Sequence, residues 1–425
     1  MKRRSFLAGV GGVAGSFALA GCTGAPPAAP SASGSGTSAS YLIGQPDTPE
    51  QLASLKTHLA DWGKSAGVQV DLQVVPNDSA RTLVQTRLRS GKGPDVFGYD
   101  TGPGFAGVLA KAGLLYDLTQ HVAGANWGIY DWAKASVTFD GKFYGIPDQI
   151  EQVGLYYNKD MFKSMSLEPP TTMANLQKAT AAVKAAGKIP FASGDKEAWE
   201  GGHLLSMALS SQVGADEMHK LIDGQGSWDS PGVKAALQVW ADFQKDGFLA
   251  PSPNGITYDN SNSLFYSGKA AMNPTGTWLI QDLKSAVKFD VGFVDFPAPD
   301  GPGVPTTGLG AGTFMSASSK NVTGALKLMD FLASAEHGEW ELARYLIPAH
   351  PIDTSAAKVS PLFQQVVNDT ASYAKSGQGT GANIDVSATD KFNKAMWDGM
   401  QGILGGTRTP AQVAAALQTA AQKSK

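Results

Sequence analysis

The sequence contains few of the residue patterns that support nucleophilic or metal-assisted chemistry. Its one cysteine, Cys22, lies near the N-terminus, and no G-x-S-x-G motif presents a nucleophilic serine. The six histidines form no H-x-x-x-H pair and no cluster with the cysteine, which disfavours both a zinc enzyme and a metal-uptake protein. No G-x-x-x-x-G-K-S/T motif is present, so the sequence gives no sign of a P-loop that binds ATP. We therefore expect no metal and no cofactor.

Carboxylates and aromatic rings are the candidates that remain for contacting a small molecule. Buried hydroxyl groups need hydrogen-bond partners, and the C–H face of a sugar ring needs a flat apolar surface. Asp, Glu and Trp side chains offer this chemistry. Two carboxyl groups about 5–10 Å apart could instead hydrolyse a glycosidic bond, and sequence spacing alone does not exclude Asp100 with Glu151. The residue types therefore leave a carbohydrate-binding protein and a glycoside hydrolase open.

The overall charge disfavours a nucleic-acid ligand. The formal net charge is -3, and it becomes more negative once the three basic residues near the N-terminus are removed with a leader. A protein that binds nucleic acid needs a basic surface to displace phosphate counterions. The length of 425 residues suits two or three domains rather than one core.

The N-terminus is predicted to carry an export signal and a lipid anchor. Basic residues at 2–4 precede a short stretch rich in Gly and Ala, so residues 1–21 are predicted to be a signal peptide rather than a membrane span. Leu19-Ala20-Gly21-Cys22 resembles a bacterial lipobox, which implies lipidation of Cys22. The paired arginines resemble a twin-arginine signal, but Sec signals also carry such pairs, so the export route stays open. Residues 22–40 are predicted to be the lipidated cysteine and a flexible tether of Thr, Gly, Ala, Pro and Ser.

The first part of the folded chain, from about Tyr41, alternates between strand and helix patterns. Thr48 and Gln51 form a capping box that begins a helix ending at Gly67. Strands are predicted over residues 41–44, 68–74 and 95–99, and a second helix over residues 79–89. This order predicts a parallel sheet covered by helices. Further helices are predicted to begin at Thr172, Ser230, Ala325 and Thr409.

Six short segments, taken in order, resemble the family-1 extracellular solute-binding proteins, the group that includes the maltose-binding protein. They are Gly93-Pro94-Asp95-Val96, Gly113-Leu114-Leu115-Tyr116-Asp117-Leu118-Thr119, Asp140-Gly141-Lys142-Phe143-Tyr144-Gly145-Ile146-Pro147, Leu155-Tyr156-Tyr157-Asn158-Lys159-Asp160-Met161-Phe162, Phe265-Tyr266-Ser267-Gly268-Lys269-Ala270-Ala271-Met272 and Gly276-Thr277-Trp278. The resemblance covers most of the chain after the tether. It implies an α/β, two-lobed, periplasmic-binding-protein-like fold of type II, with a ligand cleft between the lobes and a hinge of several crossing segments.

The resemblance also implies where the chain crosses between the lobes. The first crossing is expected just after Pro147 and the second near Pro297 to Gly308. The N-terminal lobe is then predicted over residues 41–148 and about 298–340, and the C-terminal lobe over residues 149–297 and about 341–425. Ligand binding is expected to close the lobes by hinge rotation.

The family places its ligand contacts in the cleft, and in open α/β sheets ligands bind at the carboxyl ends of strands. Trp278 is the leading stacking platform, and Glu151 is the acidic contact expected at the first crossing. Trp397 shares an amphipathic helical pattern with Phe392 and Met396 and is predicted to be core. The predicted ligand-binding residues are Gln45, Asp47, Tyr99, Asp100, Glu151, Asp195, Trp199, Gly276, Trp278, Gly308 and Gly310.

The resemblance implies the substrate-binding component of an ABC importer. We expect a monomer that binds a sugar or oligosaccharide without changing it and delivers it to the transmembrane permease subunits, which a separate ATPase drives. The lipid on Cys22 is expected to hold the protein at the outer face of the cell membrane. Neither a cofactor nor a nucleic acid is expected as a partner.

Overall fold

The computed structural model of the protein describes residues 37–46, 48–353, 359–374 and 379–423. The predicted signal peptide, Cys22 and Asp47 lie outside the described residues. Within those residues, no helix is both long enough and apolar enough to cross a membrane. Thr37–Lys425 form one unit with two main β-sheets, each with its own hydrophobic core.

The first sheet has the predicted alternation of strands and helices. Its strands lie in the order β2 (Val68–Val75), β1 (Thr37–Gly44), β3 (Val96–Asp100), β12 (Ala311–Met315) and β6 (Gly145–Pro147). β1 pairs in parallel with both β2 and β3, which confirms the predicted parallel sheet. β12 comes from much later in the chain and runs antiparallel to both β3 and β6. The sheet and its helices are called the first lobe below.

Strand β1 begins inside the segment that was predicted to be a tether. It pairs with β2 along its whole length, from Thr37 opposite Val68 onwards. The Asp95 carboxylate accepts hydrogen bonds from the backbone N–H of Ser40 at 2.9 Å and from its hydroxyl at 2.8 Å. The tether boundary at residue 40 is therefore wrong, because backbone pairing and Asp95 hold small polar residues in the sheet.

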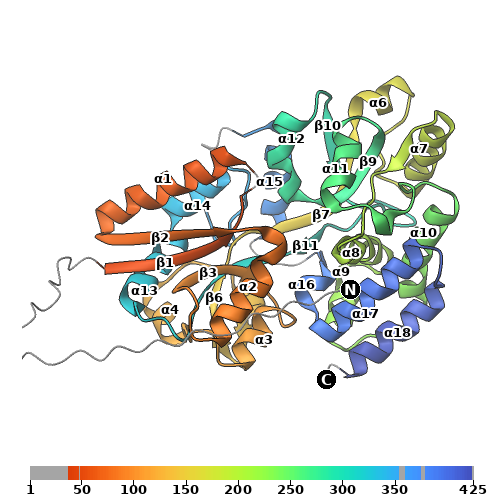
Figure 1. Ribbon diagram of the computed structural model, residues 1–425. Helices are drawn as coiled ribbons and strands as arrows, with labels where there is room; N and C mark the ends of the chain where they lie inside the picture. The colour runs from red at the N-terminus through yellow and green to blue at the C-terminus, as the bar shows by residue number, and fades with distance from the viewer. Residues whose placement is uncertain (1–36, 47, 354–358, 375–378, 424–425) are drawn as a thin grey trace, which may run out of the picture. The chain divides into compact units, whose positions relative to one another are not determined.

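Helices lie on both sides of the first sheet, with α1 on one side and α2 and α3 on the other (Figure 1). The predicted capping box of Thr48 and Gln51 is present, and Gly67 ends α1 in the left-handed conformation. The bounds are α1 (Pro49–Ala66), α2 (Asn77–Arg89), α3 (Ala106–Lys111), α4 (Thr119–Ala125), α5 (Asp131–Lys134), η1 (Ala135–Val137), β4 (Thr138–Phe139), β5 (Lys142–Phe143), α13 (Val322–Leu332) and α14 (Ala335–Leu342). Helix α13 begins earlier than the predicted Ala325.

The second sheet has a mixed topology. Its strands lie in the order β13 (Gly381–Ala382), β11 (Thr306–Gly308), β7 (Glu151–Asn158), β9 (Ala270–Gly276) and β8 (Ile189–Phe191), and β10 (Val291–Val294) also pairs with β7. β7 is buried along most of its length and pairs antiparallel with β9, β10 and β11. This sheet and its helices are called the second lobe.

Helices α8, α10, α17 and α18 pack together beside the second sheet (Figure 1). Trp240 of α10 is fully buried among them, and its indole N–H donates to the carbonyl of Leu204 at 2.8 Å. The predicted helix starts at Thr172 and Ser230 are confirmed as N-caps, and Thr409 caps the last helix. The bounds are α6 (Lys159–Ser164), α7 (Met173–Ala185), α8 (Trp199–Val213), α9 (Ala215–Ile222), α10 (Pro231–Lys245), η2 (Pro253–Gly255), α11 (Tyr258–Tyr266), η3 (Thr277–Leu279), α12 (Ile280–Ala286), α15 (Pro361–Ala374), α16 (Ile384–Ser387), α17 (Asp390–Leu404) and α18 (Pro410–Lys423).

The chain passes from the first sheet to the second across residues 148–150, between β6 and β7. It returns across Leu309 and Gly310, between β11 and β12. The predicted start of the returning segment at about residue 298 is too early. Thr306 and Thr307 still belong to the second sheet, because they pair with Val153 and Gln152 of β7.

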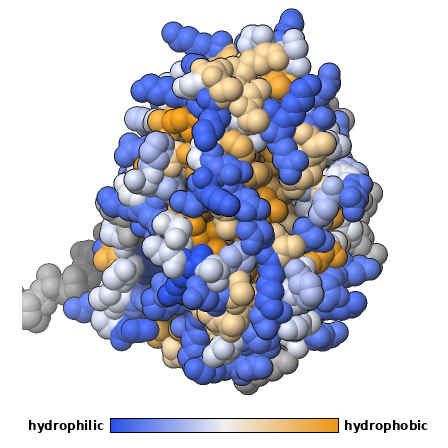
Figure 2. Space-filling model, turned by 90° about the vertical axis from the view of Figure 1, so that its right-hand side faces the viewer, coloured by the Kyte–Doolittle hydropathy of each residue, from blue (hydrophilic) through white to orange (hydrophobic). Residues whose placement is uncertain are grey.

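The surface drawn in Figure 2 is mostly hydrophilic, and its hydrophobic residues form scattered patches rather than one continuous band. Single apolar side chains are ordinary on a water-facing surface. This face therefore gives no sign of a large apolar docking area, and the structure directs attention to the cavity between the lobes.

Candidate ligand-binding site

A cavity of about 270 Å³ lies between the two lobes, and both contribute to its lining. β3 and the start of β7 bring carboxylates to it, while α8, η3 and α17 bring indole rings. The carboxyl end of β3 therefore faces the cavity, as the rule for open α/β sheets predicts. The lining residues are Arg81, Asp100, Phe105, Glu151, Trp199, His203, Trp278, Gly310, Ala311, Asn383, Asp385, Val386 and Trp397.

The first-lobe wall of the cavity is built on an ion pair at the end of β3. The Arg81 guanidinium donates two hydrogen bonds to the Asp100 carboxylate, both at 2.9 Å. The guanidinium also lies 4.6 Å from the centre of the Phe105 ring. This planar, two-point pairing fixes the orientation of both charged groups. Both side chains remain partly exposed to solvent.

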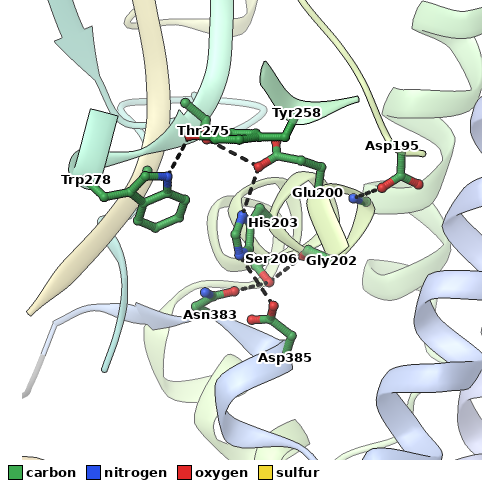
Figure 3. Close-up of polar contacts among 12 residues, drawn as sticks. Asp195, Glu200, Gly202, His203, Ser206, Tyr258, Thr275, Trp278, Asn383 and Asp385 are labelled. Atoms are coloured by element: carbon green, nitrogen blue, oxygen red, sulfur yellow. Dashed lines mark hydrogen bonds and ion pairs between the residues drawn. The ribbon is translucent and has the colours of Figure 1, made fainter. Parts of the chain in front are cut away.

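Trp278 is positioned by the G-T-W turn after β9. Its indole N–H donates to the Tyr258 hydroxyl at 2.7 Å, and its ring lies 5.2 Å from that of His203 (Figure 3). A Cβ atom at Gly276 would overlap the Trp278 ring, so glycine is what allows the indole to fold back over the strand. Trp278 is half-buried, with one side packed on the second core and another facing the cavity.

Trp199 and Trp397 add two further indole rings to the second-lobe wall. Trp199 opens α8 and lies 4.8 Å from the ring of Tyr258 and 5.1 Å from that of His203. Trp397 lies on α17 and is half-buried. Flat aromatic faces of this kind suit the C–H face of a sugar ring.

His203 lies between two buried carboxylates, Glu200 on its own helix and Asp385 on α16 (Figure 3). The His203 Nδ1 is 3.5 Å from Glu200, and its Nε2 is 3.4 Å from Asp385. Burial alone would lower the pKa of His203, but the two carboxylates outweigh it and raise that pKa to about 10. The imidazole is therefore a cation that holds both acids in place.

Three buried polar atoms on this wall have no hydrogen-bond partner among the described residues. One is His203 Nδ1, which instead lies 3.5 Å from Glu200 in an ion pair. The other two are the second carboxylate oxygen of Asp385, Oδ1, and the indole nitrogen of Trp397, Nε1. A buried polar group without a partner costs about 1–3 kcal/mol. Asp385 and Trp397 both line the cavity, so a bound ligand could satisfy one acceptor and one donor there.

Glu151 stands where the chain first enters the second sheet. Its carboxylate accepts a hydrogen bond from the Gln149 amide at 2.9 Å and lies against Gly310 of the returning segment. Burial raises the pKa of Glu151 to about 7, although Gln149 and the positive His203 act in the opposite direction. The group can therefore accept hydrogen bonds as an anion or donate one as an acid near neutral pH.

The structure brings five of the predicted residues together in the cavity lining: Asp100, Glu151, Trp199, Trp278 and Gly310. Gly276 supports the site only from behind, by making room for Trp278. Gly308 lines a neighbouring cavity of about 320 Å³, which shares Val386 with this one. Asp47 lies outside the described residues.

Three other predicted residues have structural roles away from this lining. Gln45 is exposed, and its carbonyl accepts a hydrogen bond from Asn77. Tyr99 is buried in the first core, where its hydroxyl accepts a hydrogen bond from Gln85 at 2.6 Å. Asp195 is buried before α8 and accepts a hydrogen bond from the backbone N–H of Gly201 at 2.8 Å. These three residues do not line the cavity: strand alternation directs Tyr99 into the first core, and Asp195 is held by its contact with the start of α8.

Sequence reasoning missed several lining residues. Trp397 follows Met396 directly on α17, so a rotation of about 100° carries its ring away from the core face that Phe392 and Met396 share. Helical spacing could have revealed this exposed flank. No local pattern marked the others, which are Arg81, Phe105, His203, Ala311, Asn383, Asp385 and Val386.

Residues 59–368 match the sequence model of the family described as bacterial extracellular solute-binding protein. The match spans more than half of the chain, and the chain therefore belongs to this family. The resemblance seen in the sequence motifs is thereby confirmed. Membership makes this an exported solute-binding protein rather than an enzyme.

Curated relatives include the multiple sugar-binding protein of Streptococcus mutans serotype c, which is 29% identical over 67% of this chain and 69% of its own length. The diacetylchitobiose binding protein NgcE of Streptomyces coelicolor is 26% identical over 56% of this chain and 54% of its own length. The chain thus spans little more than half of this second relative.

Solved structures share the fold over nearly the whole chain. One, from work on xylan utilization by the thermophilic bacterium Caldanaerobius polysaccharolyticus, has a TM-score of 0.80 at 25% identity and covers 90% of this chain and 99% of its own. A chitin oligosaccharide binding protein has a TM-score of 0.78 at 24% identity, covering 90% and 98%. The two-lobed α/β fold is therefore that of the solute-binding proteins.

Proposed function

We propose that this chain binds a sugar or short oligosaccharide in the cavity between its lobes and delivers it unchanged to an ABC importer. The observation that carries the proposal is the pairing of three indole rings with buried, unpartnered polar atoms in one cavity. A sugar ring offers an apolar face to the rings and hydroxyl groups to the polar atoms. The names of the relatives, a multiple sugar-binding protein and a diacetylchitobiose binding protein, support a carbohydrate.

The arrangement of acids also favours binding over hydrolysis. A glycosidase needs one carboxyl group free to protonate the leaving oxygen and a second to act as base or nucleophile. Asp100 is held by two charge-assisted hydrogen bonds to Arg81, and Asp385 is held by His203. Burial raises the pKa of Glu151 to about 7, so this lining carboxyl group could donate a proton, but the carboxylates that would have to act with it as base or nucleophile are those held by Arg81 and His203.

We infer that the ligand is enclosed by a hinge movement of the two lobes about residues 148–150 and 309–310. Contacts across the cleft support this proposal. Gly104 of the first lobe lies so close to residues 388–390 of the second lobe that a Cβ atom there would come within 3.0 Å of their backbone. Asp100 and Trp397, from opposite lobes, line the same cavity. Closure would remove the ligand from water and strengthen its polar contacts.

The remaining parts of the proposal concern the cell surface. Lipidation at Cys22 would anchor the protein to the outer face of the membrane, and residues 23–36 would act as the tether before β1. The protein would act as a monomer that presents its ligand to the transmembrane permease subunits, with ATP consumed by a separate subunit.

Isothermal titration calorimetry with a panel of mono-, di- and oligosaccharides tests the binding proposal. We expect saturable binding of at least one sugar, and chromatography of the recovered sugar should show it intact. Release of hydrolysis products at catalytic rates would contradict the proposal. Absence of binding across the whole panel would contradict it as well.

A further inference from the structure

We propose, on the basis of the proposed function, that the cavity prefers a sugar carrying a protonated amine to the same sugar without one and excludes anionic sugars. The lining combines three carboxylate side chains with aromatic faces. Each of these features favours a cationic group on the ligand.

Acidic groups outnumber basic groups around the cavity. Among the described residues, the cations of the lining are Arg81 and His203, and each already contacts carboxylates. An added phosphate or carboxylate would meet like charges at close range, which is unfavourable where water is partly excluded. The carboxylates, counting Glu200 directly behind the lining, are Asp100, Glu151, Glu200 and Asp385.

Asp385 offers a buried carboxylate oxygen that can accept a hydrogen bond from a ligand cation. Its side chain is only 9% exposed, one oxygen faces His203, and the other has no hydrogen-bond partner in the described part of the chain. A carboxylate oxygen accepts hydrogen bonds and donates none, whereas an ammonium group only donates. A hydroxyl group could also donate to Asp385, but an ammonium group adds the attraction between opposite charges, which is stronger where water is partly excluded.

Glu151 provides a second acceptor in the lining, where its carboxylate accepts hydrogen bonds from the Gln149 amide at 2.9 Å and from the backbone of Gly310. A cation placed nearby would favour its ionised form. Its carboxylate has no Lys or Arg partner among the described ion pairs, in contrast to Asp100. One ligand ammonium could therefore pair with an acidic group that no Lys or Arg already holds in the described ion pairs.

The indole rings favour the same class of ligand. Trp199, Trp278 and Trp397 line the cavity, and the face of an indole attracts cations by about 0.5–2 kcal/mol. Apolar stacking alone would suit any sugar, but carboxylates beside indole faces suit an amine in particular. An amino sugar presents its C–H face and its ammonium group within one ring, so a single pose can use both features.

Matched sugars test the preference directly. Calorimetry at about pH 6.5, below the usual pKa of an amine, should compare glucose, galactose and mannose with their 2-amino, N-acetylamino and uronic acid forms. The glucosamine disaccharide with and without N-acetyl groups extends the comparison to a longer ligand. We expect the amine to bind at least about tenfold tighter than its neutral partners, a difference of about 1.4 kcal/mol, and the uronic acids not to bind.

Two outcomes separate this inference from the function on which it rests. Tight binding of a neutral sugar without any gain from the amine, or equal binding of a uronic acid, would overturn the charge preference and leave sugar binding intact. Failure of every sugar to bind would overturn both proposals.

Charge-removing variants inside and outside the cavity test whether the preference for an amine arises from the cavity lining. Glu151→Gln preserves the side-chain shape and removes the charge, so we expect the ratio of amine to neutral affinity to fall several-fold. Asp259→Asn, on the exposed surface of α11, changes the net charge of the protein equally and should leave the ratio unchanged. An equal effect of both variants, or no effect of Glu151→Gln, would contradict the assignment.

Discussion

The two walls of the cavity hold their charges in different ways. On the first-lobe wall, Arg81 and Asp100 form a two-point ion pair in which each side chain is more than a third exposed. On the second-lobe wall, His203, Glu200 and Asp385 are each about nine-tenths buried, and one oxygen of Asp385 has no partner. The charged groups of the Arg81–Asp100 pair hold each other without a ligand, whereas the second-lobe wall has buried polar atoms for which a ligand could supply the hydrogen-bond partner.

This difference indicates that the two lobes contribute to ligand binding in different ways. A buried and fixed set of groups costs little to organise when a ligand arrives, which favours affinity. The indole rings of Trp199, Trp278 and Trp397 lie on the same second-lobe wall. We therefore expect the second lobe to hold the ligand and the first lobe to close over it.

Removing the cation from the buried wall should have the largest effect. His203→Gln leaves Glu200 and Asp385 close together without a positive charge between them, and breaking a buried pair costs about 3–5 kcal/mol. We expect the free energy of unfolding, measured in urea, to fall by about 3 kcal/mol. His121→Gln, which breaks the more exposed pair with Asp330, should cost less than about 1 kcal/mol. Equal losses of unfolding free energy in the two variants would contradict the distinction between buried and exposed groups.

The stability of the protein should fall as pH rises from about 5 to 9. Burial is the largest cause that raises the pKa of Asp148 to about 8 and of Glu151 and Asp195 to about 7, whereas these acids ionise near pH 4 in an unfolded chain. Burial opposes the charge of His203, but its carboxylate partners raise its pKa to about 10. In every case the folded state retains protons that the unfolded state has lost.

Urea unfolding across this pH range should therefore show a progressive loss of stability as the pH rises. The losses from the acids should fall between about pH 4 and 8, and that from His203 between about pH 6.5 and 10. His203→Gln should flatten the upper part of the curve. Stability that increased towards alkaline pH would show that these groups are not buried as described.

Loss of an indole from the second wall should weaken binding without unfolding the protein. We expect Trp278→Ala to reduce sugar affinity about 30-fold, or about 2 kcal/mol, as for a central aromatic contact. The free protein should lose only about 1 kcal/mol, since the indole is half-buried and makes one hydrogen bond, to Tyr258. Trp62→Ala, a half-buried ring stacked on Phe331 in the first lobe, is the matched control and should leave affinity unchanged.

The contact between the lobes can be tested with one methyl group. In Gly104→Ala, the new Cβ would lie 2.7 Å from the carbonyl oxygen of Ala388 and 2.9 Å from the backbone nitrogen of Asp390. We expect sugar affinity to fall about tenfold because closure is obstructed, while the free energy of unfolding changes by less than about 0.5 kcal/mol. Gly98→Ala has open space around the added carbon and should change neither quantity. Full affinity in Gly104→Ala would argue against closure at this contact.

Disrupting the exposed wall should have the smallest effect on stability. Arg81→Gln breaks the pair with Asp100, but exposed ion pairs contribute about 0–1 kcal/mol. We expect thermal unfolding of the free protein to change little and sugar affinity to fall only a few-fold. A loss of stability as large as that of His203→Gln would remove the distinction between the two walls.

The fold could be predicted further from the sequence than the site could. The capping box at Thr48 and Gln51 and the alternating apolar residues of β2 are local patterns, and the structure confirms both. The start of β1 at Thr37 could not be predicted, because its small residues look like a tether until β2 and Asp95 pair with them. Local sequence patterns therefore predicted which helices and strands are present better than the residues at which they begin and end.

Residues of the site were predictable where a motif carried them. Trp278 follows the G-T-W motif, and Glu151 follows the first crossing, so their chain positions pointed to the cavity. His203 and Asp385 are far apart in the sequence and meet only because α16 packs against α8. Tyr99 precedes Asp100 in β3 and therefore points to the opposite face of the sheet, into the first core.

A crystal structure of the protein with the tightest-binding sugar from the calorimetric panel would test the central claim most directly. The account predicts one sugar ring between the lobes, stacked on Trp278 or Trp397, with a donor within about 3.2 Å of Asp385 Oδ1. A sugar bound outside this cavity, or bound inside it with Asp385 Oδ1 still lacking a partner, would contradict the account.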